Sequence, residues 1–217
     1  MKIFLDTADT AVIEKHFSSE LIDGITTNPT LIMKSGRNPE DVYQELIDLG
    51  IPDISMEVVG TREQMLWEGR RLANKFGKEA TIKVPCTPDG LYVCRQLSKS
   101  LVKVNVTLIF DEAQAILAAK AGAKYVSPFV GRLDDNSIVG LDLIKRISDI
   151  YVKQNVYETE ILSASIRYVN SVSQSFANGA NIVTMPPAVF EKMYNHVLTD
   201  KGLELFDHDW KEVQAHT

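Results

Sequence analysis

The sequence predicts an α/β protein, a single (β/α)8 TIM barrel that covers residues 1–217 as one domain. Eight short runs of strand-forming residues alternate with longer helical patterns along nearly the whole chain. With 217 residues, each βα unit has about 27, which suffices because barrel helices need only short loops. No Gly/Ser-rich or Pro-rich linker interrupts the series. An open doubly wound sheet is the alternative, but no GxGxxG or GxxxxGK[ST] motif supports it.

The predicted strands are short runs rich in β-branched and aromatic residues. The first begins at Lys2 and reaches the carboxylate of Asp6 after only three apolar residues. The fourth ends in Ile82-Lys83-Val84-Pro85. The eight strands are expected at residues 2–5, 23–26, 54–58, 81–85, 102–109, 125–130, 160–163 and 181–184.

The predicted helices follow the strands and carry apolar residues at the helical period. Met65, Leu72 and Phe76 share one face of the pattern over residues 62–76. The regular pattern that begins at Asp111 stops at Gly122, a typical helix terminator. Helices are expected at residues 10–17, 30–33, 39–49, 62–76, 89–97, 111–121, 141–153, 168–178 and 187–197.

Residues 203–217 lie outside the eight units and are expected to form a C-terminal helical tail. The apolar residues Leu205, Phe206 and Trp210 stand there among charged ones. Such a segment often packs on a neighbouring subunit, so the sequence favours a homo-oligomer. Packing of the tail on its own barrel is an equally open alternative.

The composition excludes several classes of protein. The 23 Lys and Arg against 29 Asp and Glu give a net charge of −6, which argues against nucleic acid or an anionic membrane as the main partner. Two cysteines, Cys86 and Cys94, make neither a disulfide framework nor a structural zinc site. The N-terminus does not resemble a signal peptide, and no run approaches the apolar length of a membrane span. The prediction is a soluble, cytoplasmic protein without a metal site.

Polar residues concentrate where the predicted strands end. In a barrel, active residues project from the carboxyl ends of the strands and from the loops that follow. Each of the first seven predicted strands ends in a group able to contact a polar substrate. These groups are Asp6, Thr26, Thr27, Asn28, Glu57, Lys83, Asn105, Thr107, Ser127, Arg132, Ser163, Ser165 and Arg167.

Lys83 is the most unusual of them, because its neighbours are strand-forming residues. A charged, unpaired lysine in a buried strand costs several kcal/mol, which is expected to lower its pKa. A neutral amine attacks a carbonyl and gives a Schiff base. A lysine on an edge strand, or one that reaches solvent, is the alternative.

Two carboxylates are expected near Lys83. Asp6 follows the first strand and Glu57 ends the third, so both lie at the same end of the predicted barrel. Schiff-base chemistry needs proton transfers at the carbinolamine and at the hydroxyl whose proton loss accompanies carbon–carbon cleavage. Two carboxyl groups could divide that work. The alternatives are a helix cap for Asp6 and a solvated charge at the rim for Glu57.

Arg132, Ser165 and Arg167 follow strands six and seven and together suit a phosphate monoester. Phosphate sites in this fold usually lie after strands seven and eight, so the match is partial. Surface ion pairs with Asp134, Asp135 or Asp142 are the alternative for the two arginines.

Five ordered blocks of sequence resemble the transaldolase family, and most closely its short subfamily, which includes fructose-6-phosphate aldolases. The specific blocks are Gly24-Ile25-Thr26-Thr27-Asn28-Pro29-Thr30-Leu31 and Ile82-Lys83-Val84-Pro85. The others are Phe4-Leu5-Asp6-Thr7-Ala8, Val104-Asn105-Val106-Thr107-Leu108-Ile109-Phe110 and Ser127-Pro128-Phe129-Val130-Gly131-Arg132.

The resemblance implies a role for each residue of the predicted site. Lys83 would form the Schiff base with a ketose carbonyl, and Asp6 would handle the hydroxyl proton at the bond that breaks. Glu57 and Thr107 would hold the water used in carbinolamine dehydration. The fragment's hydroxyls would be bound by Asn28 and Asn105, with Thr26 and Ser127 nearby. Arg132, Ser165 and Arg167 match the family's phosphate positions.

The resemblance also bears on the type of reaction. Aldolases of this subfamily are similar except that they have Gln where this chain has Glu57 and Tyr where it has Phe129. Both residues therefore fit the transaldolase pattern: transfer of dihydroxyacetone between sugar phosphates, with no cofactor, because the lysine iminium is the electron sink. A lyase that releases free dihydroxyacetone and a non-catalytic sugar-phosphate-binding barrel are the alternatives. Family members of this length resemble pentamers paired into decamers.

Overall fold

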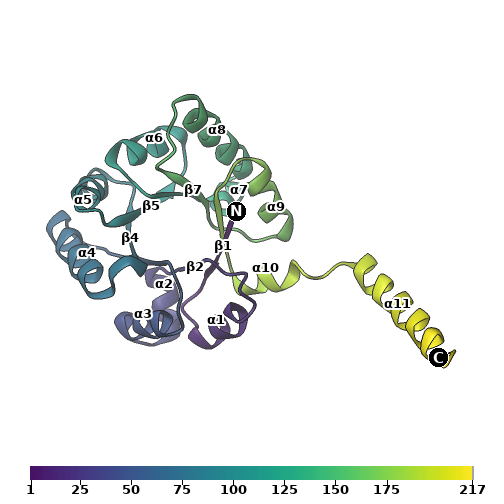
Figure 1. Cartoon of the computed structure of the whole chain (residues 1–217). Helices are drawn as coiled ribbons and strands as arrows, with labels where there is room; N and C mark the ends of the chain where they lie inside the picture. The colour runs from purple at the N-terminus through teal and green to yellow at the C-terminus, as the bar shows by residue number, and fades with distance from the viewer. Residues whose placement is uncertain (217) are drawn as a thin grey trace.

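The computed structural model describes residues 1–216 and has a closed barrel of eight parallel strands surrounded by helices (Figure 1). Each strand pairs with the next along the chain, and β8 pairs with β1 to close the barrel. The predicted fold class is therefore confirmed. The strands are β1 Lys2–Asp6, β2 Gly24–Thr26, β3 Ile54–Glu57, β4 Ala80–Pro85, β5 Lys103–Ile109, β6 Tyr125–Pro128, β7 Glu160–Ser163 and β8 Ile182–Met185.

The helices cover the outside of the barrel, and most begin at a polar capping residue. The side chains of Asp9, Thr61 and Asp111 each accept a hydrogen bond from the first turn of the helix that follows. The helices are α1 Thr10–Phe17, α2 Pro29–Ser35, α3 Pro39–Asp48, α4 Arg62–Phe76, α5 Pro88–Lys99, α6 Glu112–Ala121, α7 Val130–Asp134, α8 Gly140–Lys153, α9 Val169–Ala177, α10 Pro187–Lys192 and α11 Val197–Ala215.

The C-terminal part of the chain differs from the prediction. The helix expected over residues 187–197 ends at Lys192, and a new helix begins at Val197, where the ring of His196 accepts a hydrogen bond from the backbone of Leu198. The expected tail of residues 203–217 is thus part of a longer helix, and Thr217 lies outside the described residues.

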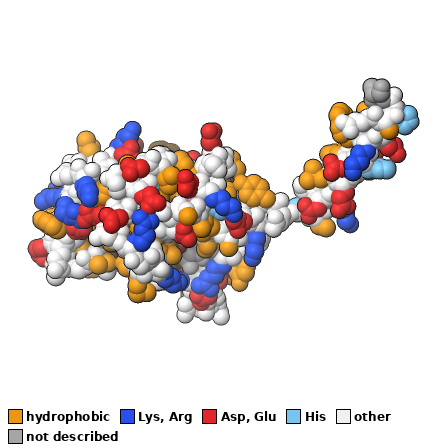
Figure 2. Space-filling view, turned by 90° about the horizontal axis from the view of Figure 1, so that it is seen from below, with side chains coloured by type: hydrophobic (Ala, Val, Ile, Leu, Met, Phe, Trp, Pro, Cys, Tyr) orange, Lys and Arg blue, Asp and Glu red, His pale blue; other side chains and the backbone are white. Residues whose placement is uncertain are grey.

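Helix α11 extends away from the barrel (Figures 1 and 2), and none of its described residues is buried. Packing of the tail on its own barrel, one of the two alternatives, is therefore wrong. The exposed apolar residues of α11 are Val197, Leu198, Leu203, Leu205, Phe206, Trp210 and Val213. Within residues 1–216 no helix is long and apolar enough to cross a membrane.

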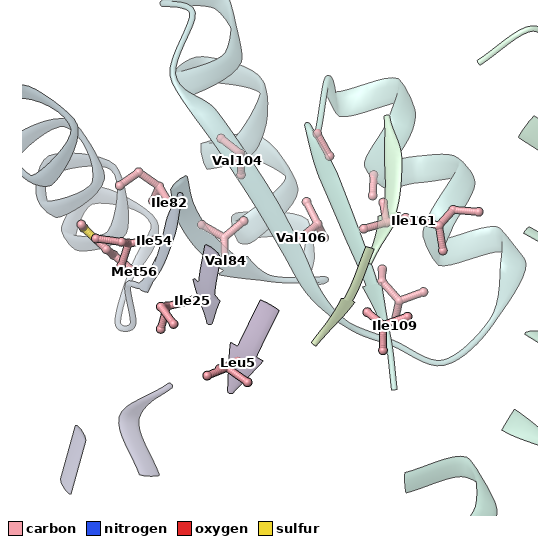
Figure 3. Close-up of a cluster of buried hydrophobic side chains, with 14 of the residues drawn as sticks. Leu5, Ile25, Ile54, Met56, Ile82, Val84, Val104, Val106, Ile109 and Ile161 are labelled. Atoms are coloured by element: carbon pink, nitrogen blue, oxygen red, sulfur yellow. The ribbon is translucent and has the colours of Figure 1, made fainter. Parts of the chain in front are cut away.

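The main hydrophobic core lies between the barrel and its helices. Side chains alternate along a strand, so Ile82 and Val84 point to this outer layer while Lys83 points into the barrel. Figure 3 shows the outer layer, with residues such as Ile54, Met56 and Val106 buried completely. Packing on helix α4 is close enough that a Cβ added at Gly69 would lie 3.2 Å from Ile82 Cγ2.

The amino-terminal end of the barrel interior is filled. Phe4, Tyr125, Leu162 and Ile182 form a buried cluster there. Beside them the Asp53 carboxylate accepts hydrogen bonds from Thr81 at 2.8 Å, Lys103 at 2.7 Å and Tyr125 at 2.9 Å. The open space inside the barrel therefore lies toward the carboxyl ends of the strands.

Candidate active site

A cavity of about 120 Å³ opens at the carboxyl ends of the strands. Four of the residues predicted at the strand ends do not line it: Thr27, Glu57, Ser163 and Arg167. Thr27 Oγ1 donates to Ser55 O, and Ser163 Oγ contacts Ser175 Oγ. Glu57 is paired with Lys83 and Arg167 with Asp135. The lining of the cavity is Asp6, Thr26, Asn28, Lys83, Asn105, Thr107, Ser127, Phe129, Arg132, Leu162, Ala164, Ser165 and Thr184. The structure thus brings together residues from all the strands except β3, whose Glu57 is paired with the lining residue Lys83.

Lys83 lies in the interior and is 5% exposed. Its Nζ donates a hydrogen bond to the carbonyl oxygen of Thr27 at 2.9 Å and lies 3.0 Å from Glu57 Oε2. The side chains of Lys83 and Glu57 are 6% and 14% exposed. An edge-strand or solvated lysine and a solvated rim carboxylate are both excluded, and the lysine is paired rather than isolated.

Asp6 is the last residue of β1, and its side chain lines the cavity. Its Oδ1 accepts a hydrogen bond from Thr26 Oγ1 at 2.8 Å. Burial raises the pKa of Asp6, while the nearby Lys83 charge and the Thr26 hydrogen bond act against that rise. Asp6 is not a helix cap, because Asp9 caps α1. A buried carboxyl group with a raised pKa is suited to both taking and returning a proton.

Two asparagines present their amides to the cavity. Asn105 Oδ1 accepts a hydrogen bond from Ser127 Oγ at 2.7 Å, and its Nδ2 donates to Ser55 Oγ at 3.3 Å, so the amide is held from both sides. Asn28 caps α2, its Oδ1 accepting from the backbone N–H of Leu31 at 3.0 Å. Because the oxygen of Asn28 is occupied, its Nδ2 is the group that remains for a ligand.

Thr107 has a buried hydroxyl without a partner. Among residues 1–216, Thr107 Oγ1 makes no hydrogen bond although the residue is only 1% exposed. The register of β5 against β6 shifts between Val106 and Ile109, and Leu108 has a φ of +60°. Such a bulge re-aims side chains, and here it lies at the residue that lines the cavity. An unsatisfied buried hydroxyl is expected to bind a water or a ligand atom.

The candidate phosphate residues are only partly assembled. Arg132, on α7, stacks over the Phe129 ring at 4.9 Å from the ring centre, and Ser165 lines the same part of the cavity. The backbone N–H of Gly131 donates to Ser165 O at 3.1 Å, and a Cβ at Gly131 would lie 2.2 Å from that oxygen, so only glycine fits.

Arg167 instead pairs with Asp135 through two hydrogen bonds, and its side chain is 45% exposed. For Arg167 the surface ion pair, the alternative left open by the sequence, is therefore what the structure contains. The predicted strand over residues 125–130 also ends early, at Pro128, because helix α7 begins at Val130 and places Arg132 at the cavity.

Sequence reasoning did not identify Thr184, Leu162 or Ala164 as lining residues. Thr184 could have been found by the strand-end rule, since it ends the eighth predicted strand. Its hydroxyl lies 2.6 Å from Thr26 Oγ1. Leu162 and Ala164 are apolar, and no feature of the sequence distinguishes them from core residues.

Comparison with known proteins agrees over nearly the whole chain. A family model described as "Transaldolase/Fructose-6-phosphate aldolase" matches residues 3–217. A protein of Paracoccus denitrificans named "Probable transaldolase" is 50% identical over 214 residues, 98% of each chain. Proteins of the same name from Nitrosopumilus maritimus and Caulobacter vibrioides are 49% and 51% identical, covering 99% and 97% of this chain and 97% and 96% of their own.

Proposed function

The chain belongs to the transaldolase/fructose-6-phosphate aldolase family, and we propose that it transfers dihydroxyacetone between sugar phosphates through a Schiff base on Lys83. The donor is fructose 6-phosphate or sedoheptulose 7-phosphate, and the acceptor is erythrose 4-phosphate or glyceraldehyde 3-phosphate. The observation that carries the proposal is the buried amine of Lys83, held in the cavity beside two carboxyl groups.

In the proposed reaction, Lys83 Nζ adds to the ketose carbonyl and the carbinolamine loses water to give an iminium ion. The amine attacks in its neutral form, and Glu57 Oε2, at 3.0 Å, is in place to receive its proton. Glu57 then acts with Thr107, whose unpartnered hydroxyl supports a bound water there. Asn28 and Asn105, with Ser127 and Thr26, bind the hydroxyl groups of the three-carbon unit.

Asp6 takes the proton of the substrate hydroxyl while the adjacent carbon–carbon bond breaks. The electron pair of that bond moves into the iminium and gives an enamine on Lys83, and an aldose phosphate leaves. When the acceptor aldehyde arrives, the enamine carbon attacks it and Asp6 returns the proton to the new hydroxyl. Water then hydrolyses the iminium and releases the product ketose. No metal or organic cofactor takes part in these steps.

The phosphate of donor and acceptor is proposed to bind Arg132, Ser165 and Arg167. For Arg167 this requires an exchange of partners, since its guanidinium is bound to Asp135 in the structure. The exchange is favourable because a dianionic phosphate provides more acceptor oxygens than a carboxylate and can be shared with Arg132.

The choice of transfer over release rests on Glu57 and Phe129, the two positions at which aldolases of the short subfamily differ. Phe129 packs edge-on against Phe110, with ring centres 5.9 Å apart, and provides no hydroxyl to the cavity. Without that proton donor the enamine on Lys83 persists until an acceptor aldehyde arrives.

The test is the dependence of product formation on the acceptor. The enzyme is incubated with fructose 6-phosphate, with and without erythrose 4-phosphate, and glyceraldehyde 3-phosphate is measured. Transaldolase activity predicts rapid formation only when erythrose 4-phosphate is present. Equal rates without it would identify a lyase, and no product under either condition would indicate a barrel that only binds sugar phosphates.

The assembly is proposed to be a homo-oligomer, a pentamer or decamer, located in the cytoplasm. Its support is α11, which exposes a series of apolar residues well away from its own barrel. Analytical ultracentrifugation of the full chain tests this, and a monomeric mass at micromolar concentration would contradict it.

A further inference from the structure

A row of hydroxyl groups connects Asp6 to the inner wall of the barrel. Thr26 Oγ1 donates to Asp6 Oδ1 at 2.8 Å and lies 2.6 Å from Thr184 Oγ1. In the barrel, Thr26 of β2 is the register partner of Asp6, and Thr184 of β8 is the partner of Phe4. The two threonines therefore approach from the two strands that flank β1, and they meet inside the barrel. They are 2% and 3% exposed.

Counting protons fixes the direction of these bonds when Asp6 is ionised. A carboxylate only accepts hydrogen bonds, and a threonine hydroxyl has one proton to donate. The proton of Thr26 goes to Asp6, so the short contact between the two hydroxyls must be made by the proton of Thr184. The chain then runs from Thr184 through Thr26 to Asp6.

When Asp6 is protonated on Oδ1, the oxygen that faces Thr26, the same three groups are satisfied in the opposite direction. The carboxylic acid donates to Thr26 Oγ1, and Thr26 donates to Thr184 Oγ1. The proton of Thr184 is then free to turn toward the cavity, which this residue lines. Both protonation states of the Asp6 carboxyl group thus keep a complete set of hydrogen bonds with the two threonines.

We propose that Thr184 is a positioning residue that acts through Thr26, allowing Asp6 to take and return a proton with its hydrogen bonds complete in either state. The inference rests on the proposed function, in which Asp6 does both within one turnover. The charged groups that face Asp6 are Lys83 of β4 and Glu57 of β3, and neither contributes to the hydroxyl chain.

Removal of the Thr184 hydroxyl predicts the direction in which the pKa of Asp6 changes. In Thr184→Val, ionised Asp6 still accepts from Thr26. When Asp6 carries its proton on Oδ1 and donates to Thr26, the proton of Thr26 is left buried without an acceptor. The variant therefore disfavours the protonated form, and the pKa of Asp6 falls. Thr184→Ser keeps the hydroxyl and is the matched control.

The experiment measures pH profiles of kcat and kcat/KM for wild type, Thr184→Val and Thr184→Ser with fructose 6-phosphate and erythrose 4-phosphate. Loss of one buried hydrogen bond predicts a kcat about tenfold lower for the valine variant, with KM little changed. The acid limb of the pH profile of the valine variant is expected to move to lower pH. Serine restores both the rate and the position of the limb. A valine variant with unaltered kcat and pH profile overturns the proposal, as does a rate lowered equally by valine and serine with no movement of the limb.

A second readout separates this inference from the proposed function. The carboxyl group of Asp6 is titrated by ¹³C NMR in protein labelled at aspartate, and the Asp6→Asn variant identifies its resonance. A lower pKa of Asp6 in Thr184→Val than in Thr184→Ser supports the proposed row of hydroxyl hydrogen bonds, even if the wild-type enzyme transfers no dihydroxyacetone. Equal pKa values of Asp6 in the two variants overturn it. Thr184→Ala replaces the valine variant in both measurements if the latter does not fold.

Discussion

Replacing Thr107 by valine is expected to make the free protein more stable and the enzyme much slower. The hydroxyl of Thr107 is buried and has no hydrogen-bond partner among the described residues, so in the free protein it contributes little or nothing to stability. Valine has nearly the same shape and no unsatisfied polar atom.

The magnitudes follow from the surroundings of this hydroxyl. A buried polar group without a partner costs about 1–3 kcal/mol, and partial hydration in the cavity reduces the expected gain to about 1 kcal/mol. For a chain of this size that gain corresponds to a Tm about 2–4 °C higher. Loss of a group that positions the reacting water is expected to lower kcat roughly 100-fold.

The matched control is Thr81→Val, also a fully buried threonine inside the barrel. Thr81 Oγ1 donates to Asp53 Oδ1 at 2.8 Å, so its removal breaks a hydrogen bond to a charged group and is expected to cost about 2 kcal/mol. Since this bond lies at the filled end of the barrel, kcat should change little. A third variant, Thr107→Ser, keeps the hydroxyl and should retain most of the activity.

Thermal unfolding is measured at one protein concentration for all variants, because oligomerisation affects Tm. The kcat values come from the coupled assay for glyceraldehyde 3-phosphate. The reasoning is refuted if Thr107→Val is less stable than wild type and still turns over at the wild-type rate. A fall in Tm equal to that of Thr81→Val would likewise show that Thr107 has a structural partner.

Three further predictions concern the phosphate site, the reaction type and Asp6. Arg167→Ala should raise KM about 10- to 100-fold for phosphorylated substrates while kcat changes little, because the substitution removes charge-assisted hydrogen bonds to the phosphate. An equal rise in KM with unphosphorylated substrates would contradict this role. Phe129→Tyr should increase release of free dihydroxyacetone relative to transfer, because it adds a proton donor beside the enamine, and an unchanged ratio would exclude the residue as a determinant. Burial raises the pKa of Asp6 in the folded protein, so ionisation of Asp6 destabilises the fold above that pKa and the cost disappears as the pH falls below the unfolded value. Asp6→Asn should therefore raise Tm more at neutral pH than at a pH below the ordinary aspartate value of 3.8, and an equal change at both would show that the burial of Asp6 has no such cost.

The barrel was predictable because its signals are local. Strands such as β4 and β5 consist of strand-forming residues, and the helices between them carry apolar residues at the helical period and recognisable caps. In a closed parallel barrel the active residues project from the carboxyl ends of the strands, so the barrel prediction also indicated which end carries the site. Lys83 and Asn105 could be placed there without knowing any contact, and their Cα atoms are indeed register partners.

The differences lie where the outcome depends on tertiary contacts. Helix α7 has only five residues, too few to produce a periodic pattern, and it replaces the expected end of the sixth strand. The pairing of Arg167 with Asp135 joins residues 32 positions apart, and nothing local distinguishes Asp135 from Asp134 or Asp142 as its partner. The Thr26–Thr184 contact spans 158 positions and exists only because β8 closes the barrel against β1.

The central claim is tested most directly by trapping the bond to the substrate. The protein is incubated with fructose 6-phosphate, reduced with borohydride and mapped by peptide mass spectrometry. A reduced adduct is predicted on Lys83. Lys103 is the internal control, since it binds Asp53 at the filled end of the barrel and should stay unmodified. An unmodified Lys83 in a folded protein saturated with substrate would contradict the account.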